Sequence, residues 1–391
     1  GGGVVGAATA LALAADGRRV ALVEVRAPTP WTPDAPDLRV YAFAPDNAAL
    51  LDDLGAWASV ADTRAHPYRH MRVWDAAGGG ELAFEAAALG RDSLGWIVEN
   101  ELLVDRLWQR LHAVDGLQLH CPDRVAGLVQ DADSARLELE SGVRLEARLV
   151  VAADGAASPL RALAGIEVSP HDYHQRGLVA YVATVQPHRD TAWQRFLPGG
   201  PLAFLPCADG VLPGAAPGCT SSIVWSLPED EAARLLDADE AAFRRELTRA
   251  FDATLGEVVA VSRRVAFPLR RQLAPRYHAG RVVLAGDAAH AVHPLAGQGV
   301  NLGLRDVACL RRLVAEAGSN DIGASHRLAR YQRERRSDNV VSAYAFEGIN
   351  RLFSNDAVLP TLLRGPLLGL AGRVPGLGAV FARKAVGMKR G

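Results

Sequence analysis

Near its start the chain alternates between apolar runs typical of buried strands and patterns typical of helices, up to about Leu54. Residues 7–15 are rich in alanine and leucine and predict a helix, and Val20-Ala21-Leu22-Val23 predicts a buried parallel strand. A further helix is predicted from about Asn100 to Ala113, where leucines recur at spacings of three and four. This alternation of strands and helices is typical of an α/β fold.

In two later segments of the chain, the apolar positions recur with a period of two. Pro67 to Leu89 predicts short strands, and Gly177 to Phe267 predicts a mainly antiparallel sheet, interrupted by one helix from about Glu229 to Leu255. Leu137 to Val151 predicts a hairpin with its turn at Ser141-Gly142. We therefore expect an antiparallel sheet inserted into an α/β domain.

The last third of the chain returns to the first pattern. Val282-Val283-Leu284-Ala285 predicts a buried strand that returns to the first sheet, and the chain beyond Asn301 is predicted to be mainly helical. At 391 residues the chain is too long for one simple core. Two domains, one interrupted by the other, and a helical tail are the natural expectation.

The first six residues have the GxGxxG spacing of a dinucleotide-binding loop. In such a loop Gly1 allows the tight turn, Gly3 lets the backbone approach a pyrophosphate, and Gly6 lets the helix pack on its strand. Glu24 ends the following strand at close to the ~20-residue spacing of the acid that binds a ribose. The loop alone is a weak signal, but together with Glu24 it predicts nucleotide binding. A central strand normally precedes this loop, so we expect about 5–6 further apolar residues ahead of Gly1.

A second set of candidate ligands lies about 280 residues downstream. Gly286-Asp287 follows a predicted strand, where a carboxylate can accept hydrogen bonds from ribitol hydroxyls, and Asp154-Gly155 also follows one. Paired with the glycine loop, these turns predict one long dinucleotide, FAD. The glycine-rich segment Pro294 to Asn301 then leads into a helix predicted over Leu304 to Ala315. Free N–H groups at that helix start would stabilise the negative charge of a reduced flavin ring.

Composition and charge exclude several other classes of protein. The net charge of −1 gives no general attraction to nucleic acid. The four cysteines form no CxxC pair and no metal-ligand spacing, so we expect free thiols and no metal site. No run of 18 apolar residues predicts a membrane span. For His290 and His293 we expect structural roles, because no carboxylate lies at a ligand spacing from them.

The segment Val282 to Asp306, VVLAGDAAHAVHPLAGQGVNLGLRD, resembles the FAD-contacting motif of the flavin-dependent aromatic hydroxylases of ubiquinone biosynthesis, the UbiH, UbiF and UbiI/VisC group. This group belongs to the p-hydroxybenzoate hydroxylase-like flavoprotein monooxygenases. Further segments resemble it in order: Asp37–Val40, Trp96–Asn100, Asp154-Gly155, Phe196–Pro206 and Leu352–Ser354. The resemblance covers essentially the whole chain. It implies a Rossmann-like FAD-binding domain built from discontinuous segments, an inserted mainly antiparallel β-sheet substrate domain and a helical C-terminal tail.

The resemblance also implies domain limits and site residues. The FAD-binding domain would comprise residues 1–66, 98–168 and 272–325, the substrate domain 67–97 and 169–271, and the helical C-terminal region 326–391. The implied FAD ligands are Gly1, Gly3 and Gly6 at the pyrophosphate, Glu24 at the adenosine ribose, Arg39 on the phosphate side, Asp287 with Gly286 at the ribitol, and Pro294, Gly297, Gln298, Gly299 and Asn301 at the isoalloxazine ring. Asp154 belongs to a motif that the resemblance links to both FAD and the pyridine nucleotide. No catalytic acid or base can be named from the sequence.

The activity implied by the resemblance is a ring hydroxylation. FAD would be reduced by NADPH or NADH, react with O2 to a flavin hydroperoxide, and transfer one oxygen atom to the ring of a polyprenylated phenol or quinol. Two other functions stay open: a non-catalytic flavin-binding subunit of a biosynthetic complex, and another flavoprotein of this fold such as a prenyl reductase. A flavin halogenase is disfavoured, because the only lysines are Lys384 and Lys389. Which ring carbon is hydroxylated stays open as well.

The end of the chain has a charge pattern of its own. From Arg327 onward there are 12 Arg or Lys and 4 Asp or Glu, while leucines recur among the arginines. Such an amphipathic basic tail fits the inner membrane surface, a subunit of a biosynthetic complex or a second copy of the chain, and it fits a solvated helical face equally well. We expect a cytoplasmic protein in peripheral contact with the membrane at most.

Overall fold

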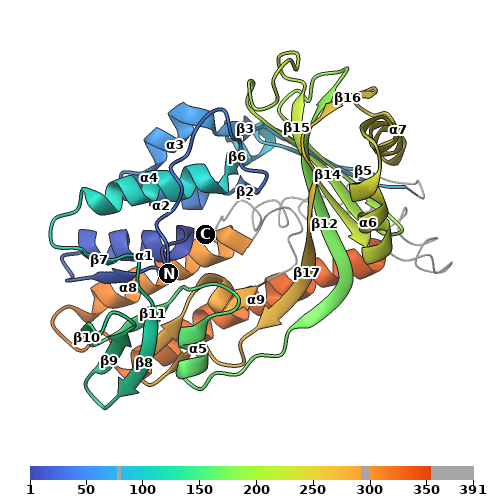
Figure 1. The fold of residues 1–391 in the computed structure, drawn as a ribbon. Helices are drawn as coiled ribbons and strands as arrows, with labels where there is room; N and C mark the ends of the chain where they lie inside the picture. Colours follow the sequence, from blue (N-terminus) through green and yellow to red (C-terminus); the bar gives the residue numbers. More distant parts are fainter. Residues whose placement is uncertain (77–80, 292–298, 354–391) are drawn as a thin grey trace.

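The computed structural model describes residues 1–76, 81–291 and 299–353, with side chains up to residue 340. Helix α1 (Val4–Ala15) begins directly after Gly3 and is buried along most of its length. It packs against α4 (Asn100–His112) on one side and α8 (Gly299–Ala317) on the other (Figure 1). Small side chains make this close three-helix contact feasible, because alanines of α1 contribute much of its buried surface.

Two short sets of parallel strands lie next to these helices. Strand β1 (Ala21–Val23) pairs with β7 (Gln118–His120), and β11 (Val150–Ala152) pairs with β19 (Val282–Leu284). β18 (His278–Ala279) adds an antiparallel edge to β19. The predicted strand at 282–285 is therefore present, but it pairs with β11 and not with β1.

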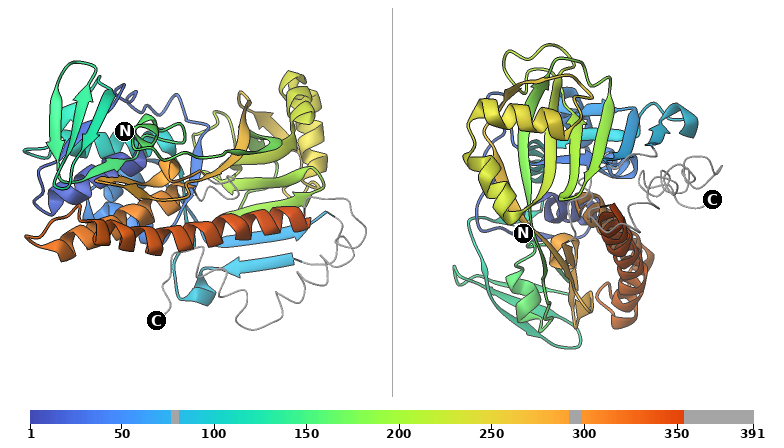
Figure 2. Two further views of the ribbon diagram at one scale, coloured as in Figure 1. Left: turned by 90° about the horizontal axis from the view of Figure 1, so that it is seen from below. Right: turned by 90° about the vertical axis from the view of Figure 1, so that its right-hand side faces the viewer.

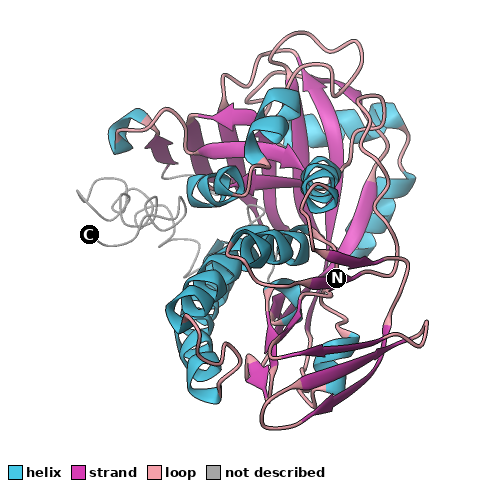
Figure 3. Ribbon diagram, turned by 90° about the vertical axis from the view of Figure 1, so that its left-hand side faces the viewer, coloured by secondary structure: helices cyan, strands magenta, loops and turns pink. Residues whose placement is uncertain are grey.

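A three-stranded antiparallel sheet lies at the opposite end of the molecule from the largest sheet (Figure 1, Figure 3). Its strands are β8 (Val125–Gln130), β9 (Ala135–Leu139) and β10 (Arg144–Ala147). The predicted turn is correct, because Gly142 takes a positive φ of 86° between β9 and β10. The predicted hairpin extended too far, however. After Ala147 the chain leaves this sheet, because the apolar run that follows is buried as β11 beside β19.

The largest sheet has nine strands and combines two distant segments of the chain. All its pairings are antiparallel except that of β13 with β4. Its strands are β4 (His70–Asp75), β5 (Glu81–Glu85), β12 (His171–Thr184), β13 (Thr191–Leu197), β14 (Gly200–Pro206), β15 (Thr220–Pro228), β16 (Val258–Val261), β17 (Val265–Leu273) and β20 (His290–Ala291).

Two helices cover one face of this sheet, α6 (Glu229–Asp237) and α7 (Glu240–Ala250) (Figure 1). The sequence predicted a single helix here, and that prediction was wrong. The first helix ends at Asp237, and Asp239 caps the start of the second, its Oδ1 accepting a hydrogen bond of 2.7 Å from the amide of Ala242. Such a capping side chain favours a helix start over a helix interior. The apolar sides of both helices, with Leu235 and Phe243, pack on the sheet.

The opposite face of the large sheet packs against a three-stranded sheet of β2 (Val40–Phe43), β6 (Gly95–Glu99) and β3 (His66–Tyr68). The remaining short elements are α2 (Pro45–Asp53), α3 (Trp57–Arg64), the 3-10 turns η1 (Ala87–Leu89) and η2 (Gly286–Ala288), and α5 (Pro159–Leu163). This packing brings the start of β2, with Arg39 directly before it, to the face of the large sheet.

Helix α9 (Ser325–Phe353) runs along the molecule past both the small parallel strands and the large sheet (Figure 2). It contacts β18 at one end and β14 at the other, so it spans both predicted domains. The predicted domain limits stay a prediction. Among the described helices, none has an apolar stretch that would cross a membrane.

Candidate cofactor and substrate site

A single cavity of about 2180 Å³ connects the glycine loop to the face of the large sheet. Residues of β1 and β11 line it, as do residues of β13, β14 and β15. The predicted site residues that line it are Gly1, Gly3, Gly6, Glu24, Arg39, Asp154, Asp287 and Gly299. Residues from both ends of the sequence therefore meet at one place.

The three glycines of the loop differ in what surrounds them. A Cβ atom on Gly6 would lie 1.8 Å from the carbonyl oxygen of Gly1, and one on Gly1 would lie 2.6 Å from the carbonyl oxygen of Ala153. A Cβ atom on Gly3 would meet nothing within 4 Å. Gly1 and Gly6 are thus required by packing, whereas Gly3 keeps the approach to the first amides of α1 open. No side chain caps those amides.

The Glu24 carboxylate is held beneath the glycine loop by backbone amides. It accepts hydrogen bonds from the amide of Gly2, from that of Val25 at 2.8 Å and from that of Arg26 at 3.2 Å. The indole of Trp108 donates to the carbonyl oxygen of Gly2 at 2.7 Å and fixes the loop from below. The Glu24 carboxylate lies at the cavity wall. The role of Glu24 as a ribose ligand stays a prediction.

Arg39 contributes a cation to the same cavity. Its guanidinium carbon lies 5.5 Å from the centre of the Tyr41 ring, and its amide donates to Asp37 at 2.9 Å. The pKa of Arg39 is raised, chiefly by Tyr41 and further by Asp287 and Asp37, against an opposing effect of burial. The hydroxyl of Tyr181, on β12, donates to the carbonyl oxygen of Asp37 at 2.6 Å. The large sheet therefore anchors the loop that carries Arg39.

Gly286 makes the turn that presents Asp287 to the cavity. Its φ of +60° favours glycine, and a Cβ atom there would lie 3.1 Å from Val5 of α1. On α8, a Cβ atom at Gly303 would lie 2.5 Å from Val5 and 3.2 Å from Gly286. The turn, α1 and α8 are therefore in direct contact, and this fixes Asp287 beside the start of α8.

The helix after the glycine-rich segment begins at Gly299, five residues before the predicted start. This earlier start puts Asn301 inside the first turn. Its side chain is fully buried and accepts hydrogen bonds of 2.9 Å from the amide of Ala44 and from Asn47, while it donates to the carbonyl of Ala42 at 2.8 Å. The Asn301 side chain thus joins α8 to the chain around β2 and does not line the cavity, in contrast to Gly299 and Val300.

Of the remaining predicted FAD ligands, one lies at the cavity and three fall outside the part of the chain that the structure describes. Asp154 lines the cavity and accepts hydrogen bonds from the hydroxyl of Ser158 and from the amide of Leu160, at 3.1 Å for the latter, so it also fixes the start of α5. Pro294, Gly297 and Gln298 lie outside the described residues.

The sequence analysis did not single out Asp306, which is fully buried in α8. It accepts hydrogen bonds from the amide of Gly286 at 3.0 Å, from His290, and from Arg335 on α9 at 2.7 Å. Burial alone would raise the pKa of Asp306, but His290 and Arg335 outweigh it and lower the pKa to about 2. An acid among the apolar residues Leu304, Val307 and Leu310 was the signal that could have revealed it.

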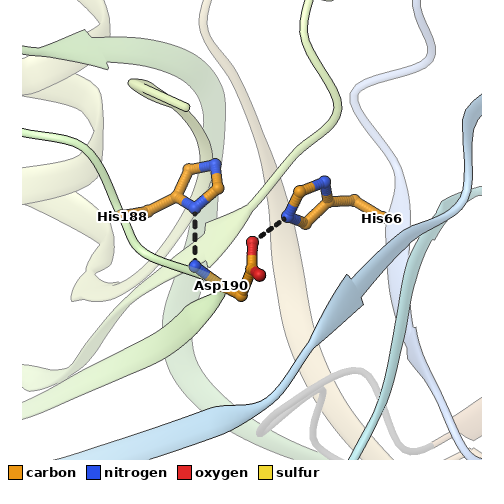
Figure 4. A group of neighbouring side chains, drawn as sticks. All are labelled: His66, His188 and Asp190. Atoms are coloured by element: carbon orange, nitrogen blue, oxygen red, sulfur yellow. Dashed lines mark hydrogen bonds and ion pairs between the residues drawn. The ribbon is translucent and has the colours of Figure 1, made fainter. Parts of the chain in front are cut away.

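A second cluster that the sequence did not predict joins His66, His188 and Asp190 (Figure 4). Their candidate ligand atoms lie within 4.8 Å of one another. His66 Nε2 lies 3.0 Å from Asp190 Oδ1, the Asp190 amide donates to His188 Nδ1 at 3.1 Å, and Arg69 donates to Asp190 Oδ2 at 3.3 Å. These contacts engage both carboxylate oxygens of Asp190, His66 Nε2 and His188 Nδ1. The cluster fixes the tight turn at Arg189 and Asp190, both at positive φ, at the start of β13.

Comparison with known proteins agrees with this geometry. The model of an FAD-binding domain family matches residues 1–342. The chain is 38% identical to the 3-demethoxyubiquinol 3-hydroxylase of Escherichia coli (strain K12), over 95% of this chain and 92% of the relative. The chain belongs to the FAD-dependent hydroxylases of ubiquinone biosynthesis. It is also 37% identical to the ubiquinone hydroxylase UbiL of Rhodospirillum rubrum, over 99% of this chain and 88% of that protein.

The fold of this hydroxylase is shared with solved monooxygenases. The p-nitrophenol 4-monooxygenase PnpA of Pseudomonas putida DLL-E4 superimposes with a TM-score of 0.75 at 21% identity, covering 100% of this chain and 98% of the other. At that identity the likeness shows the fold alone. It confirms the predicted α/β architecture with its inserted sheet.

The residues of this hydroxylase fit its FAD cofactor. The open side of Gly3 and the uncapped amides of α1 can accept a pyrophosphate, because a helix start offers free N–H groups and a positive dipole. Asp287 and Arg39 lie on the wall of the same cavity. When bound there, FAD supplies the redox chemistry with O2, and the protein supplies placement, charge and exclusion of water.

Proposed function

We propose that this hydroxylase adds one oxygen atom to the ring of a polyprenylated phenol or quinol, using O2 and NADPH or NADH. The observation that supports this most is the continuity of the cavity from the glycine loop to the apolar face of the large sheet. A cofactor held at the loop and an aromatic ring held at the sheet would share one continuous cavity. Mostly apolar walls with a few polar groups are typical of such small-molecule sites.

The chain's own residues have separable tasks in this proposal. Gly1, Gly3 and Gly6 hold the pyrophosphate, Glu24 holds the ribose, and Asp287 binds the ribitol. Arg39 keeps a positive charge on the phosphate side. Asp154 and the start of α8 at Gly299 complete the cofactor site from two further elements. The face of β14 and β15 keeps the ring in an apolar, water-excluding environment.

We also propose that the basic C-terminal region holds the enzyme at the inner membrane surface, where a polyprenylated substrate dissolves. The excess of arginine from Arg327 onward supports electrostatic attraction to anionic lipid. Binding to anionic vesicles should weaken as salt is added, because salt screens exposed charges. Binding that is insensitive to salt, or found equally with neutral vesicles, would contradict the electrostatic part. Sedimentation of the protein without vesicles would reveal self-association or assembly instead.

The activity is tested with protein loaded with FAD and supplied with NADPH, O2 and a short-chain prenylphenol. We expect substrate-stimulated NADPH oxidation and a product heavier by one oxygen atom, followed by mass spectrometry. Protein that binds FAD but shows no stimulated oxidation with any prenylphenol or prenylquinol would overturn the proposal in favour of a non-catalytic flavin subunit. A product reduced in its prenyl chain would indicate a prenyl reductase.

A further inference from the structure

One row of side chains crosses the large sheet on the face that borders the cavity. The strand register places Val73, Gln194, Ala203, Val224, Val179 and Val265 side by side on six neighbouring strands. All except Gln194 are aliphatic. Because alternate residues of a strand share a face, Gln194 occupies a position at which its neighbours specify an apolar surface.

The Gln194 side chain is buried, with 9% of its surface exposed, and it lines the cavity. Its amide makes no hydrogen bond to any other residue in the described parts of the chain, 1–76, 81–291 and 299–353. The flanking side chains Ala203 and Val73 offer it no polar atom. The Gln194 amide atoms are not among the fully buried polar atoms that lack a partner, so they are reached from the cavity. A polar group of a ligand in the cavity can therefore bind this amide without displacing a protein partner.

We propose that the side-chain amide of Gln194 binds the ring hydroxyl of the substrate, an inference that rests on the proposed function. A phenol hydroxyl donates one hydrogen bond and accepts another, and a glutamine amide offers both an acceptor oxygen and donor N–H groups. The small side chain of Ala203, directly beside Gln194, leaves room for a flat ring against the sheet. Gln194 is therefore the group that distinguishes a phenol from a hydrocarbon of the same shape.

The geometry also limits which other residue could do this. On the same face, Ser226 is the other uncharged polar side chain of β13, β14 or β15 that lines the cavity within the described residues. It lies in a different row, opposite Gly177. A serine hydroxyl is short, whereas the longer glutamine amide projects further into the space. Ser226 thus fits a second, weaker polar contact to the same ligand.

The test compares two ligands on two variants of FAD-loaded protein. The ligands are a short-chain prenylphenol and the matching prenylbenzene, which lacks the ring oxygen. The variants are Gln194→Met, which keeps the length but removes the amide, and Gln186→Met, the same change at an exposed glutamine outside the cavity. Dissociation constants are measured by the change in flavin fluorescence. FAD affinity is measured separately and should be unchanged in both variants.

We expect wild type and Gln186→Met to bind the phenol about tenfold more tightly than the hydrocarbon, the effect of one good hydrogen bond. In Gln194→Met this preference should disappear, while prenylbenzene binds as well as before. If Gln194→Met does not fold, Gln194→Ala replaces it with the same expectation. A preference for the phenol that survives in the Gln194 variant overturns this inference but leaves the proposed function intact. If wild type binds no prenylphenol at all, both are overturned.

Discussion

Asp306 on α8 accepts a hydrogen bond from the backbone amide of Gly286, with 3.0 Å between the amide nitrogen and Oδ2. This bond joins the turn that presents Asp287 to a helix whose first residues border the same cavity. Arg335 of α9 binds the other carboxylate oxygen at 2.7 Å. One buried carboxylate therefore links the predicted ribitol ligand to two helices.

Replacing this carboxylate should destabilise the protein. Asp306→Asn removes the negative charge that compensates Arg335, whose side chain is buried, and an uncompensated buried charge costs about 3–5 kcal/mol. The free energy of unfolding of the FAD-free protein, measured in urea, should fall by about that amount. The control is Glu138→Gln, which breaks an exposed pair with Arg144 and should change stability by about 1 kcal/mol or less. Equal effects of the two changes would contradict this account.

Gly3 and Gly6 of the glycine loop should respond differently to an added methyl group. Gly6→Ala should prevent normal folding of the loop, because the new Cβ atom would lie 1.8 Å from the carbonyl oxygen of Gly1. Gly3→Ala should leave the FAD-free protein stable to within about 1 kcal/mol, since the Cβ atom meets nothing within 4 Å. Its affinity for FAD should nevertheless fall at least about tenfold.

Thermal unfolding of the FAD-free variants and titration with FAD separate these outcomes. A Gly3→Ala protein that binds FAD as tightly as wild type would show that the pyrophosphate does not approach this residue. A Gly6→Ala protein as stable as wild type would show that the loop can rearrange.

A substitution at Asn301 tests whether its side chain stabilises the fold or contacts the cofactor. Asn301→Ala leaves the amide of Ala44 and the carbonyl of Ala42 without their buried partner, and we expect a loss of about 2–4 kcal/mol in the FAD-free protein. The exposed Asn320→Ala is the control and should be nearly neutral. If Asn301→Ala instead kept full stability and lost only FAD affinity, the side chain would be a flavin contact, as the sequence predicted.

The lowered pKa of His188 should make the free energy of unfolding depend on pH. Burial, and secondly the neighbouring His66, lower the pKa of His188 to about 4. In the unfolded chain a histidine takes up its proton below about pH 6.5, whereas folded His188 stays neutral down to about pH 4. The contribution of neutral His188 to the free energy of unfolding is therefore fully present above about pH 6.5. It is lost as the pH falls to about 4. The loss should be about 3 kcal/mol.

The measurement is the free energy of unfolding in urea across this pH range, for wild type and His188→Asn. The difference between them should shrink as the pH falls, and the exposed His112→Asn should run parallel to wild type. A constant difference would mean that the His188 proton is not linked to folding. Added Zn²⁺ that raises the Tm of wild type but not of His188→Asn would make the cluster with His66 and Asp190 a metal site.

Local sequence patterns determined the individual helices, strands and turns named below. The glycine spacing, the helix after it and the strand ending at Glu24 are short-range features, since each depends on steric limits or apolar periodicity within a few residues. The same holds for the turn at Gly286 and for the antiparallel strands of the large sheet. The family likeness then sufficed to predict the FAD-dependent hydroxylase.

Only the tertiary structure decided what the long-range contacts do. It turned Asn301 away from the cavity and towards Ala44, placed Asp306 between Gly286 and Arg335, and set Gln194 alone in an aliphatic row. None of these roles is visible locally, because a buried polar side chain takes its meaning from partners that lie tens or hundreds of residues away. The break before Asp239 was missed for a related reason: a helix period continues across it, and a single capping hydrogen bond marks where the second helix begins.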